Sequence, residues 1–192
     1  MRAIQGSFFN EPSFNEQEGF SYRPEFLDQA EEETLLTHVR NLPFREFEFH
    51  GYTGKRRVVS FGWKYDFSGQ KLREADAIPE FLLPLRSRAA AFARLDADAF
   101  EQVLVTEYAP GAGIGWHRDK GVFGEVVGVS LLASCILRFR RKLDQKWERI
   151  NVLAEPRSAY HLTGPARAEW QHSILRVDAL RYSITFRTMS EG

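Results

Sequence analysis

Two histidines and one aspartate in the second half of the chain form a candidate metal site. His117 and Asp119 stand two positions apart in the segment EYAPGAGIGWHRDK, and His172 opens the run HSILRV. Residues two apart on an extended strand point to the same face, so the imidazole and the carboxylate can reach one ion. Two histidines with one carboxylate make the facial triad of non-haem Fe(II) oxygenases. The pattern also occurs in chains without a metal, so by itself it leaves both interpretations open.

A second group of polar side chains lies on the segment RYSITFR near the end of the chain. Strand alternation places Arg181, Ser183, Thr185 and Arg187 on one face, opposite an apolar face. A small dicarboxylate needs cationic forks, and arginine offers a bidentate geometry that lysine lacks. The alternative is an edge strand whose arginines lie in solvent.

The two groups together resemble the AlkB family of Fe(II)- and 2-oxoglutarate-dependent dioxygenases. The family pattern NxYxPG, HxDK, H and RYNxTFR is matched in order by TEYAPG, HRDK, His172 and RYSITFR, and the resemblance covers most of residues 57–189. It implies Fe(II), 2-oxoglutarate and O₂ as cofactor and cosubstrates. The implied reaction is the oxidative dealkylation of alkylated bases in DNA, or alternatively in RNA, coupled to decarboxylation of 2-oxoglutarate to succinate and CO₂.

The resemblance also assigns roles to individual residues. His117, Asp119 and His172 are the implied Fe(II) ligands and the catalytic centre. Arg181 resembles the arginine that pairs with the distal carboxylate of 2-oxoglutarate. Arg187 resembles the second arginine of the motif, which lies near the metal-binding end of the cosubstrate.

Tyr108, Thr106 and Ser183 complete the implied cosubstrate site. Tyr108 matches the tyrosine that hydrogen-bonds 2-oxoglutarate, whereas Thr106 and Ser183 stand where many members have asparagine. Both keep a hydrogen-bonding side chain, so cosubstrate binding is expected to survive. Gly121 stands where some DNA-repair members carry an acidic residue that reads the base, and this departure concerns base preference rather than the chemistry.

The segment RRVVSFGWKYDF resembles the nucleotide-recognition lid of the family. Enzymes that act on a base must take it out of the stack, and an exposed aromatic side chain in a lid can stack on it. Trp63 is the implied stacking residue, with Tyr65 and Phe67 beside it, and core packing is the alternative for each ring. Arg57, at the end of the basic run 55–57, is expected to contact phosphate.

The elements that position these residues follow from the periodicity of the sequence. Helices are predicted near Glu25–Arg40, with Pro24 in the first turn, and near Pro84–Leu95. Short strands are predicted for RVVSFGW, QVLVTEY, VVGVSLL, CILRFRR, RINVL, SAYHLTG, HSILRV and RYSITFRT. Helices followed by strands favour an α+β fold with a sandwich or jelly roll. The resemblance specifies a double-stranded β-helix, the cupin-like jelly roll, with the N-terminal helices packed on one sheet.

Length and composition set further expectations. With 192 residues and 43% apolar side chains, we expect one domain over 1–192, with helices and lid in 1–100 and the jelly-roll core in 101–189. The single cysteine, Cys135, excludes an internal disulfide framework, and its apolar surroundings indicate a buried thiol. No apolar run approaches the roughly 20 residues that span a bilayer, and the first residues lack a secretory pattern. We therefore expect a cytoplasmic monomer that binds no membrane.

The formal net charge is zero, but basic residues gather in one segment: Arg138, Arg140, Arg141, Lys142, Lys146 and Arg149. Scattered surface charge and a phosphate-facing surface both explain such a cluster. The expected partner is an alkylated nucleic acid, either single-stranded or a duplex with a flipped base. A tRNA-modifying or protein-modifying hydroxylase is one alternative, and a non-catalytic cupin-like metal-binding protein is another. Arg181 and Arg187 argue against the latter, because a bare metal site needs no dicarboxylate clamp.

Overall fold

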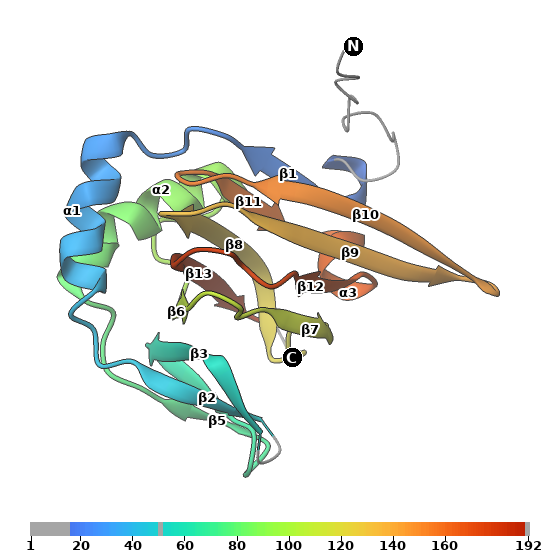
Figure 1. Cartoon of the computed structure of the whole chain (residues 1–192), viewed down its shortest axis with the longest axis horizontal. Coiled ribbons are helices and arrows are strands. Elements are labelled where there is room, and N and C mark those ends of the chain that lie inside the picture. The colour runs from blue at the N-terminus through green and yellow to red at the C-terminus, as the bar shows by residue number, and fades with distance from the viewer. Residues whose placement is uncertain (1–15, 50–51, 191–192) are drawn as a thin grey trace.

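Two antiparallel sheets face each other in the computed structural model, which describes residues 16–49 and 52–190 (Figure 1). In spatial order, the larger sheet consists of β1 (Phe20–Arg23), β11 (Ala159–Leu162), β8 (Phe123–Leu131), β13 (Arg181–Met189), β6 (Gln102–Tyr108), β3 (Tyr52–Phe61) and β2 (Arg45–Phe49). The smaller sheet consists of β10 (Lys146–Ala154), β9 (Cys135–Leu143), β12 (Gln171–Ile174) and β7 (Ile114–His117). A separate hairpin is formed by β4 (Trp63–Asp66) and β5 (Lys71–Glu74). This arrangement confirms the predicted α+β jelly roll.

Helices cover the outer face of the larger sheet, the face turned away from the smaller sheet (Figure 1). They are α1 (Gln29–Val39) and α2 (Leu83–Ala93), which follows a 3₁₀ turn, η2 (Glu80–Leu82). Their apolar side chains pack with the sheet in one buried cluster that includes Leu36, Val39, Ala89, Val105, Val129 and Ile184. A short helix, α3 (Gly164–Ala168), and a 3₁₀ turn, η1 (Glu16–Glu18), lie elsewhere. Because the helices fill one face, the polar residues of the larger sheet are left to face the smaller sheet.

The start of α1 is later than the sequence predicted. Glu25 has a left-handed backbone, with φ of 51°, which a helix cannot include. Asp28 accepts a hydrogen bond from the Glu31 backbone N–H at 2.8 Å, and the Glu31 carboxylate accepts one from the Asp28 N–H at 2.9 Å. This capping box starts the helix at Gln29. The second helix lies where it was predicted, with Pro84 in its first turn.

Each run predicted as a strand contains one, but β1, β2, β4, β5 and β7 were not predicted as strands, β4 apart from its first residue, Trp63. Three of these, β1, β2 and β7, lie at the edges of the two main sheets. Edge strands commonly carry charged residues, as β2 (REFEF) does, and β7 lies in a glycine-rich segment that reads as a turn. Such sequences weaken the signal of a half-buried strand.

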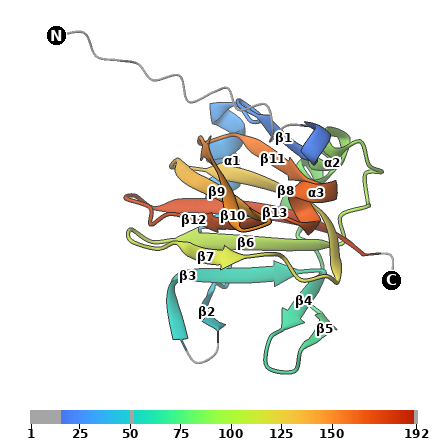
Figure 2. The same ribbon diagram turned by 90° about the vertical axis from the view of Figure 1, so that its right-hand side faces the viewer.

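Two hairpins project from the side of the sheets on which β6 and β7 lie (Figure 2). They are formed by β2 with β3 and by β4 with β5, where the lid was predicted. The strands β1 to β3, from the first hundred residues, share the larger sheet with four strands of the second half. Among the described residues, none of the helices combines the length and the apolar character needed to cross a membrane.

Candidate active site

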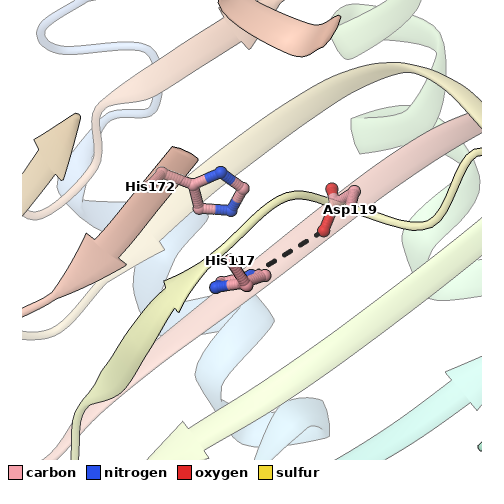
Figure 3. A group of neighbouring side chains, drawn as sticks. All are labelled: His117, Asp119 and His172. Carbon is pink, nitrogen blue, oxygen red and sulfur yellow. Dashed lines mark ion pairs between the residues drawn. The ribbon is translucent and has the colours of Figure 1, made fainter. Parts of the chain in front are cut away.

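His117, Asp119 and His172 lie together in the structure. His117 is the last residue of β7, and His172 on β12 is its direct cross-strand partner. The two ring centroids are 4.2 Å apart, and His117 Nε2 is 3.9 Å from Asp119 Oδ1 (Figure 3). One ligand atom from each side chain lies within 4.8 Å of the others. The three side chains are therefore close enough to share one ion.

The aspartate is positioned differently from the prediction. β7 ends at His117, so Asp119 lies in the following loop rather than on the same strand. Arg187 on β13 holds its carboxylate: Nε donates to Asp119 Oδ2 at 3.1 Å, while Nη1 donates to Gln102 Oε1 at 2.9 Å. His117 Nδ1 lies 2.9 Å from the Gly115 carbonyl oxygen, so Nδ1–H donates there and Nε2 is left to face Asp119.

The ionisation states of these side chains suit a divalent cation. Burial alone would raise the pKa of Asp119, but the Arg187 guanidinium and the neighbouring imidazoles outweigh it and hold that pKa well below its usual range. Burial lowers the pKa of His172 to about 3, and it also lowers the pKa of His117. At neutral pH the cluster is one carboxylate with two neutral imidazoles, and these are the forms that bind metal.

The polar face of β13 is buried. β13 lies in the middle of the larger sheet between β8 and β6, so the alternative of an edge strand with solvent-exposed arginines is wrong. Arg181, Ser183, Thr185 and Arg187 are all buried on one face, while the three intervening side chains join the core under the helices. Buried guanidinium groups need polar or anionic partners.

Arg181 is only 1% exposed, and its hydrogen-bonding capacity is only partly used. Its Nη2 donates to Ser130 Oγ at 2.7 Å, and its guanidinium carbon lies 4.9 Å from the centroid of the Tyr108 ring. Its Nε and Nη1 are buried without a hydrogen-bond partner in the described part of the chain. An unpaired buried donor is costly, more so when charged. A carboxylate is the partner whose geometry best fits this guanidinium fork.

The other predicted cosubstrate residues lie on the same face as Arg181. Tyr108 is directly opposite Arg181 across β6 and β13, and Thr106 is directly opposite Ser183. All of these side chains are buried. The register of two neighbouring strands therefore gathers the four residues into one patch beside the metal candidates.

Two partners of the arginines were not singled out from the sequence. They are Ser130, which accepts from Arg181, and Gln102, which accepts from Arg187. Each is a buried polar residue next to apolar ones: Gln102 precedes Val103 and Leu104, and Ser130 lies between Val129 and Leu131. A buried polar side chain requires a hydrogen-bonding partner, so this contrast with the neighbouring residues was the signal that could have found them.

Comparison with known proteins identifies the family. The sequence profile of the 2OG-Fe(II) oxygenase superfamily matches residues 19–187. The chain belongs to this superfamily. Membership confirms the expected enzyme class, a dioxygenase that uses Fe(II), 2-oxoglutarate and O₂, and the triad together with the half-satisfied Arg181 fits that set.

The curated relatives of this oxygenase include AlkB homologues, as the sequence motifs indicated. The alkylated DNA repair protein ALKBH8 homolog of Arabidopsis thaliana is 28% identical over 182 residues, which cover 81% of this chain and 50% of that protein. The probable RNA/DNA demethylase ALKBH6 of Danio rerio is 30% identical over 65% of this chain and 51% of its own length. The chain thus spans about half the length of these two relatives. The mitochondrial alkB homolog 7 of Bos taurus is 29% identical over 92% of this chain and 81% of that protein.

Solved structures share the fold of this oxygenase. OsALKBH1 superposes with a TM-score of 0.69 at 17% identity and covers 88% of this chain and 96% of its own. A prolyl-4-hydroxylase from Pseudomonas putida superposes with a TM-score of 0.59 at 17% identity, over 91% of this chain and 94% of its own. At such identities the likeness concerns the fold alone.

The β4–β5 hairpin of the oxygenase contacts the loop that carries Asp119. Lys120 Nζ lies 5.1 Å from the centroid of the Tyr65 ring and 5.4 Å from that of Phe67. The two rings pack edge to face, 5.1 Å apart. Trp63 is half-buried and shares a side of β4 with Tyr65 by strand alternation. Trp63 and Tyr65 therefore lie on an element that contacts Lys120, the residue after Asp119.

Arg57, which was predicted to contact phosphate, lies on the face of the larger sheet that the helices cover. Its Nη2 is 2.7 Å from Glu107 Oε1, and its guanidinium lies 5.6 Å from the centroid of the Phe44 ring. Glu107 also accepts from the Tyr182 hydroxyl at 3.0 Å, and Tyr182 belongs to the core on the helix side. Alternation turns the neighbouring Arg56, the direct partner of Tyr108 across β3 and β6, toward the site face.

Proposed function

We propose that this oxygenase removes alkyl groups oxidatively from alkylated bases in DNA, presented as a single strand or flipped out of a duplex. The observation that carries the nucleic-acid substrate is the aromatic β4–β5 hairpin held against Lys120, next to Asp119. A half-buried tryptophan on such a hairpin is suited to stack on an extracted base. The repair activity named in the Arabidopsis relative supports the same substrate class.

In this proposal, His117, Asp119 and His172 hold Fe(II) through one atom each. Their distances and ionisation states match the facial triad. Fe(II) bound there, with 2-oxoglutarate and O₂, supplies the two-electron oxidation of a C–H bond. Arg187 fixes the orientation of the Asp119 carboxylate through two hydrogen bonds of 3.1 and 3.4 Å. Hydrogen bonds from a neighbouring residue to a metal-binding carboxylate commonly fix the orientation of that carboxylate.

Arg181 then pairs with the far carboxylate of 2-oxoglutarate. A bidentate contact joins one of its unpaired nitrogens with the second N–H of Nη2, whose other N–H donates to Ser130. Tyr108 packs against the guanidinium, while Thr106 and Ser183 provide hydroxyls one row further along the sheet. These residues orient the cosubstrate relative to the metal ligands and exclude water from it.

The proposed reaction replaces one hydrogen of the alkyl carbon by a hydroxyl group. One oxygen atom of O₂ enters that hydroxyl and the other enters succinate, while 2-oxoglutarate loses CO₂. For an N-methyl base, the hydroxymethyl group then leaves as formaldehyde, and the ring nitrogen regains its normal valence. The hairpin aromatic residues hold the base during this sequence.

The test is a repair assay with purified protein, Fe(II), 2-oxoglutarate and ascorbate. Methylated and etheno-modified DNA oligonucleotides are offered, and the products are analysed by mass spectrometry. We expect unmodified base, aldehyde and succinate in equal amounts. A protein that forms succinate only with RNA, tRNA or peptide would contradict the DNA assignment and keep the enzyme class.

RNA is the second candidate substrate, because one relative at 30% identity is named an RNA/DNA demethylase. The two candidate substrates are distinguished by comparing turnover of DNA oligonucleotides with that of RNA oligonucleotides that have the same sequence and the same methylated bases. Higher kcat/KM on RNA than on DNA of the same sequence would favour this candidate.

A further inference from the structure

The outer face of the smaller sheet carries a row of stacked arginines and tryptophans. We call Trp116, Arg138, Arg140 and Trp147 the Trp–Arg row. The Arg140 guanidinium carbon lies 4.4 Å from the ring centroids of both Trp116 and Trp147. The Arg138 guanidinium carbon lies 4.8 Å from Trp116. The row crosses the sheet from β7 to β10, which is three strand spacings, or roughly 14 Å.

Hydrogen bonds fix both arginines of the row without neutralising them. Arg138 Nε donates to Ser173 Oγ at 3.0 Å, and Arg140 Nε donates to Gln171 Oε1 at 2.7 Å. Both acceptors are uncharged, and among the side chains that the structure describes, no carboxylate forms an ion pair with either arginine, whereas Arg141 has three such partners. The terminal guanidinium nitrogens of the row are thus held in place with their charge uncompensated.

The adjacent arginine on β9, Arg141, differs because carboxylates neutralise its charge. Arg141 points to the other side of the strand and pairs with Glu18 at 2.9 Å, Glu148 at 3.1 Å and Glu169 at 3.2 Å. On the outer face, by contrast, the direct cross-strand partner of Arg140 is another arginine, Arg149. Like charges directly opposite each other destabilise a sheet. This arrangement weakens the fold on its own and becomes favourable when a polyanion lies across it.

Two further features of this face suit a single strand of nucleic acid. Trp147 is 41% exposed, so a base can stack on its ring. At the other end of the row, an open hollow of about 550 Å³ is lined by Arg138, Arg176 and Leu175, with the glycines of β7 and the loop before it. A hollow of this kind has room for a base or a phosphate group beside two cationic side chains.

We propose that single-stranded DNA binds across the Trp–Arg row, with phosphates on Arg138, Arg140 and Arg149 and a base on Trp147. The inference rests on the proposed function and adds a binding surface outside the active site. Trp116 and His117 are neighbours on β7, which is an edge strand, and alternation turns them to opposite faces. A DNA strand that crosses this edge passes from the row to the metal candidates on the other side.

The test measures binding and turnover separately. Binding of unmodified dT12 is measured by fluorescence anisotropy over a series of salt concentrations, for wild type, Arg138→Gln/Arg140→Gln and Trp147→Ala. Each single-strand phosphate contact contributes about −0.7 to the slope of log K against log salt, so the double variant should be shallower by about 1.4. Loss of one stacked base should weaken binding about fivefold or more in Trp147→Ala. Arg94→Gln, at the end of α2 on the helix side, should match wild type.

Turnover on a methylated mononucleotide, which is too short to reach the row, should be unchanged in all variants. A protein that binds dT12 through the row yet repairs no DNA would refute the proposed function alone. Normal dT12 binding by both row variants, with thermal melting confirming that they fold, would overturn the binding surface. Tighter binding of rU12 than of dT12, lost in the same variants, would replace DNA by RNA as the occupant.

Discussion

One pair of arginines lies inside the jelly roll and another pair lies on its outer surface, and the two pairs meet different physical conditions. Arg181 and Arg187 are buried between the sheets, where their guanidinium nitrogens either hydrogen-bond to fixed protein groups or, in Arg181, are left without a partner in the described part of the chain. Arg138 and Arg140 are stacked on tryptophans at the outer face, where solvent has access. A buried guanidinium can select one small anion, because an unmade contact there is expensive. A guanidinium on the outer face adds a modest, salt-dependent contribution to the binding free energy of a polyanion that makes many contacts. Substitution of a buried arginine should therefore nearly abolish binding of its anion, whereas substitution of an outer arginine should lower the affinity for nucleic acid only in part.

The largest effect is expected from the metal candidates inside. His172→Ala removes one of the three protein ligands and should abolish succinate formation while the protein stays folded. Iron content and succinate are measured on the same preparation. Replacing Fe(II) by Zn²⁺ should fill the site without turnover, because zinc has no redox chemistry. Near-normal succinate production by His172→Ala would rule out the proposed iron site.

His38→Ala is the matched control for that experiment. His38 lies on α1 and stacks on Phe81, with ring centroids 4.8 Å apart, on the helix side of the larger sheet. Its removal should leave both iron content and turnover unchanged. A similar loss in both variants would indicate a general effect on folding.

The next largest effect concerns the cosubstrate. Arg181→Ala would leave the far carboxylate of 2-oxoglutarate unpaired in a buried site, which typically costs about 2–5 kcal/mol, or about 30- to 5,000-fold in affinity. Arg181→Lys should recover little, since an ammonium group cannot form the bidentate fork. The affinity for 2-oxoglutarate is measured anaerobically, with iron content checked.

Arg140→Gln sharpens this comparison between the two faces. Its affinity for 2-oxoglutarate should equal that of wild type, because Arg140 is on the outer face of the other sheet. If Arg181→Ala also bound 2-oxoglutarate normally, the cosubstrate assignment would fail and β13 would be a purely structural strand.

A smaller effect is expected at the hairpin. Trp63→Ala should weaken binding of a methylated oligonucleotide by about 1–3 kcal/mol, the usual contribution of one stacked base. Decarboxylation of 2-oxoglutarate without substrate should hardly change, because the metal and cosubstrate residues are intact. Both rates are measured under the same conditions. Equal loss of both activities would place Trp63 in the core instead.

The sequence predicted the inner face of β13 well because that strand alternates cleanly. One side of RYSITFR packs under the helices and the other faces the smaller sheet, so period two survives along its length. The position of Asp119 was harder to predict. Its spacing from His117 suggested a shared strand, yet its place is set by Arg187, a residue 68 positions away in the chain. Contacts of that range leave no local pattern in the sequence.

The two consecutive arginines of the run 55–57 show another feature that the sequence alone does not predict, namely which sheet face each side chain occupies. In the run 55–57, alternation guarantees that Arg56 and Arg57 face opposite sides of β3, but nothing local says which one faces the site. That depends on the register with β6, where Arg56 is opposite Tyr108 and Arg57 is opposite Glu107. Charge alone therefore does not say which of the two arginines faces the metal candidates, and the register places Arg56 on that face.

The smallest expected effect tests this difference between Arg56 and Arg57. Arg57 is 50% exposed and pairs with Glu107, which keeps its hydrogen bond from Tyr182 when the arginine is removed. An exposed ion pair of this kind contributes at most about 1 kcal/mol to stability. Arg57→Ala should thus lower the free energy of unfolding in urea by no more than that amount, with unchanged oligonucleotide affinity and turnover. Arg56→Ala, on the site face of the same strand, should reduce turnover. If Arg57→Ala instead weakened oligonucleotide binding and made the salt slope shallower by about 0.7 to 0.9, one phosphate contact would have been lost. The helix side of β3 would then belong to the nucleic-acid surface after all.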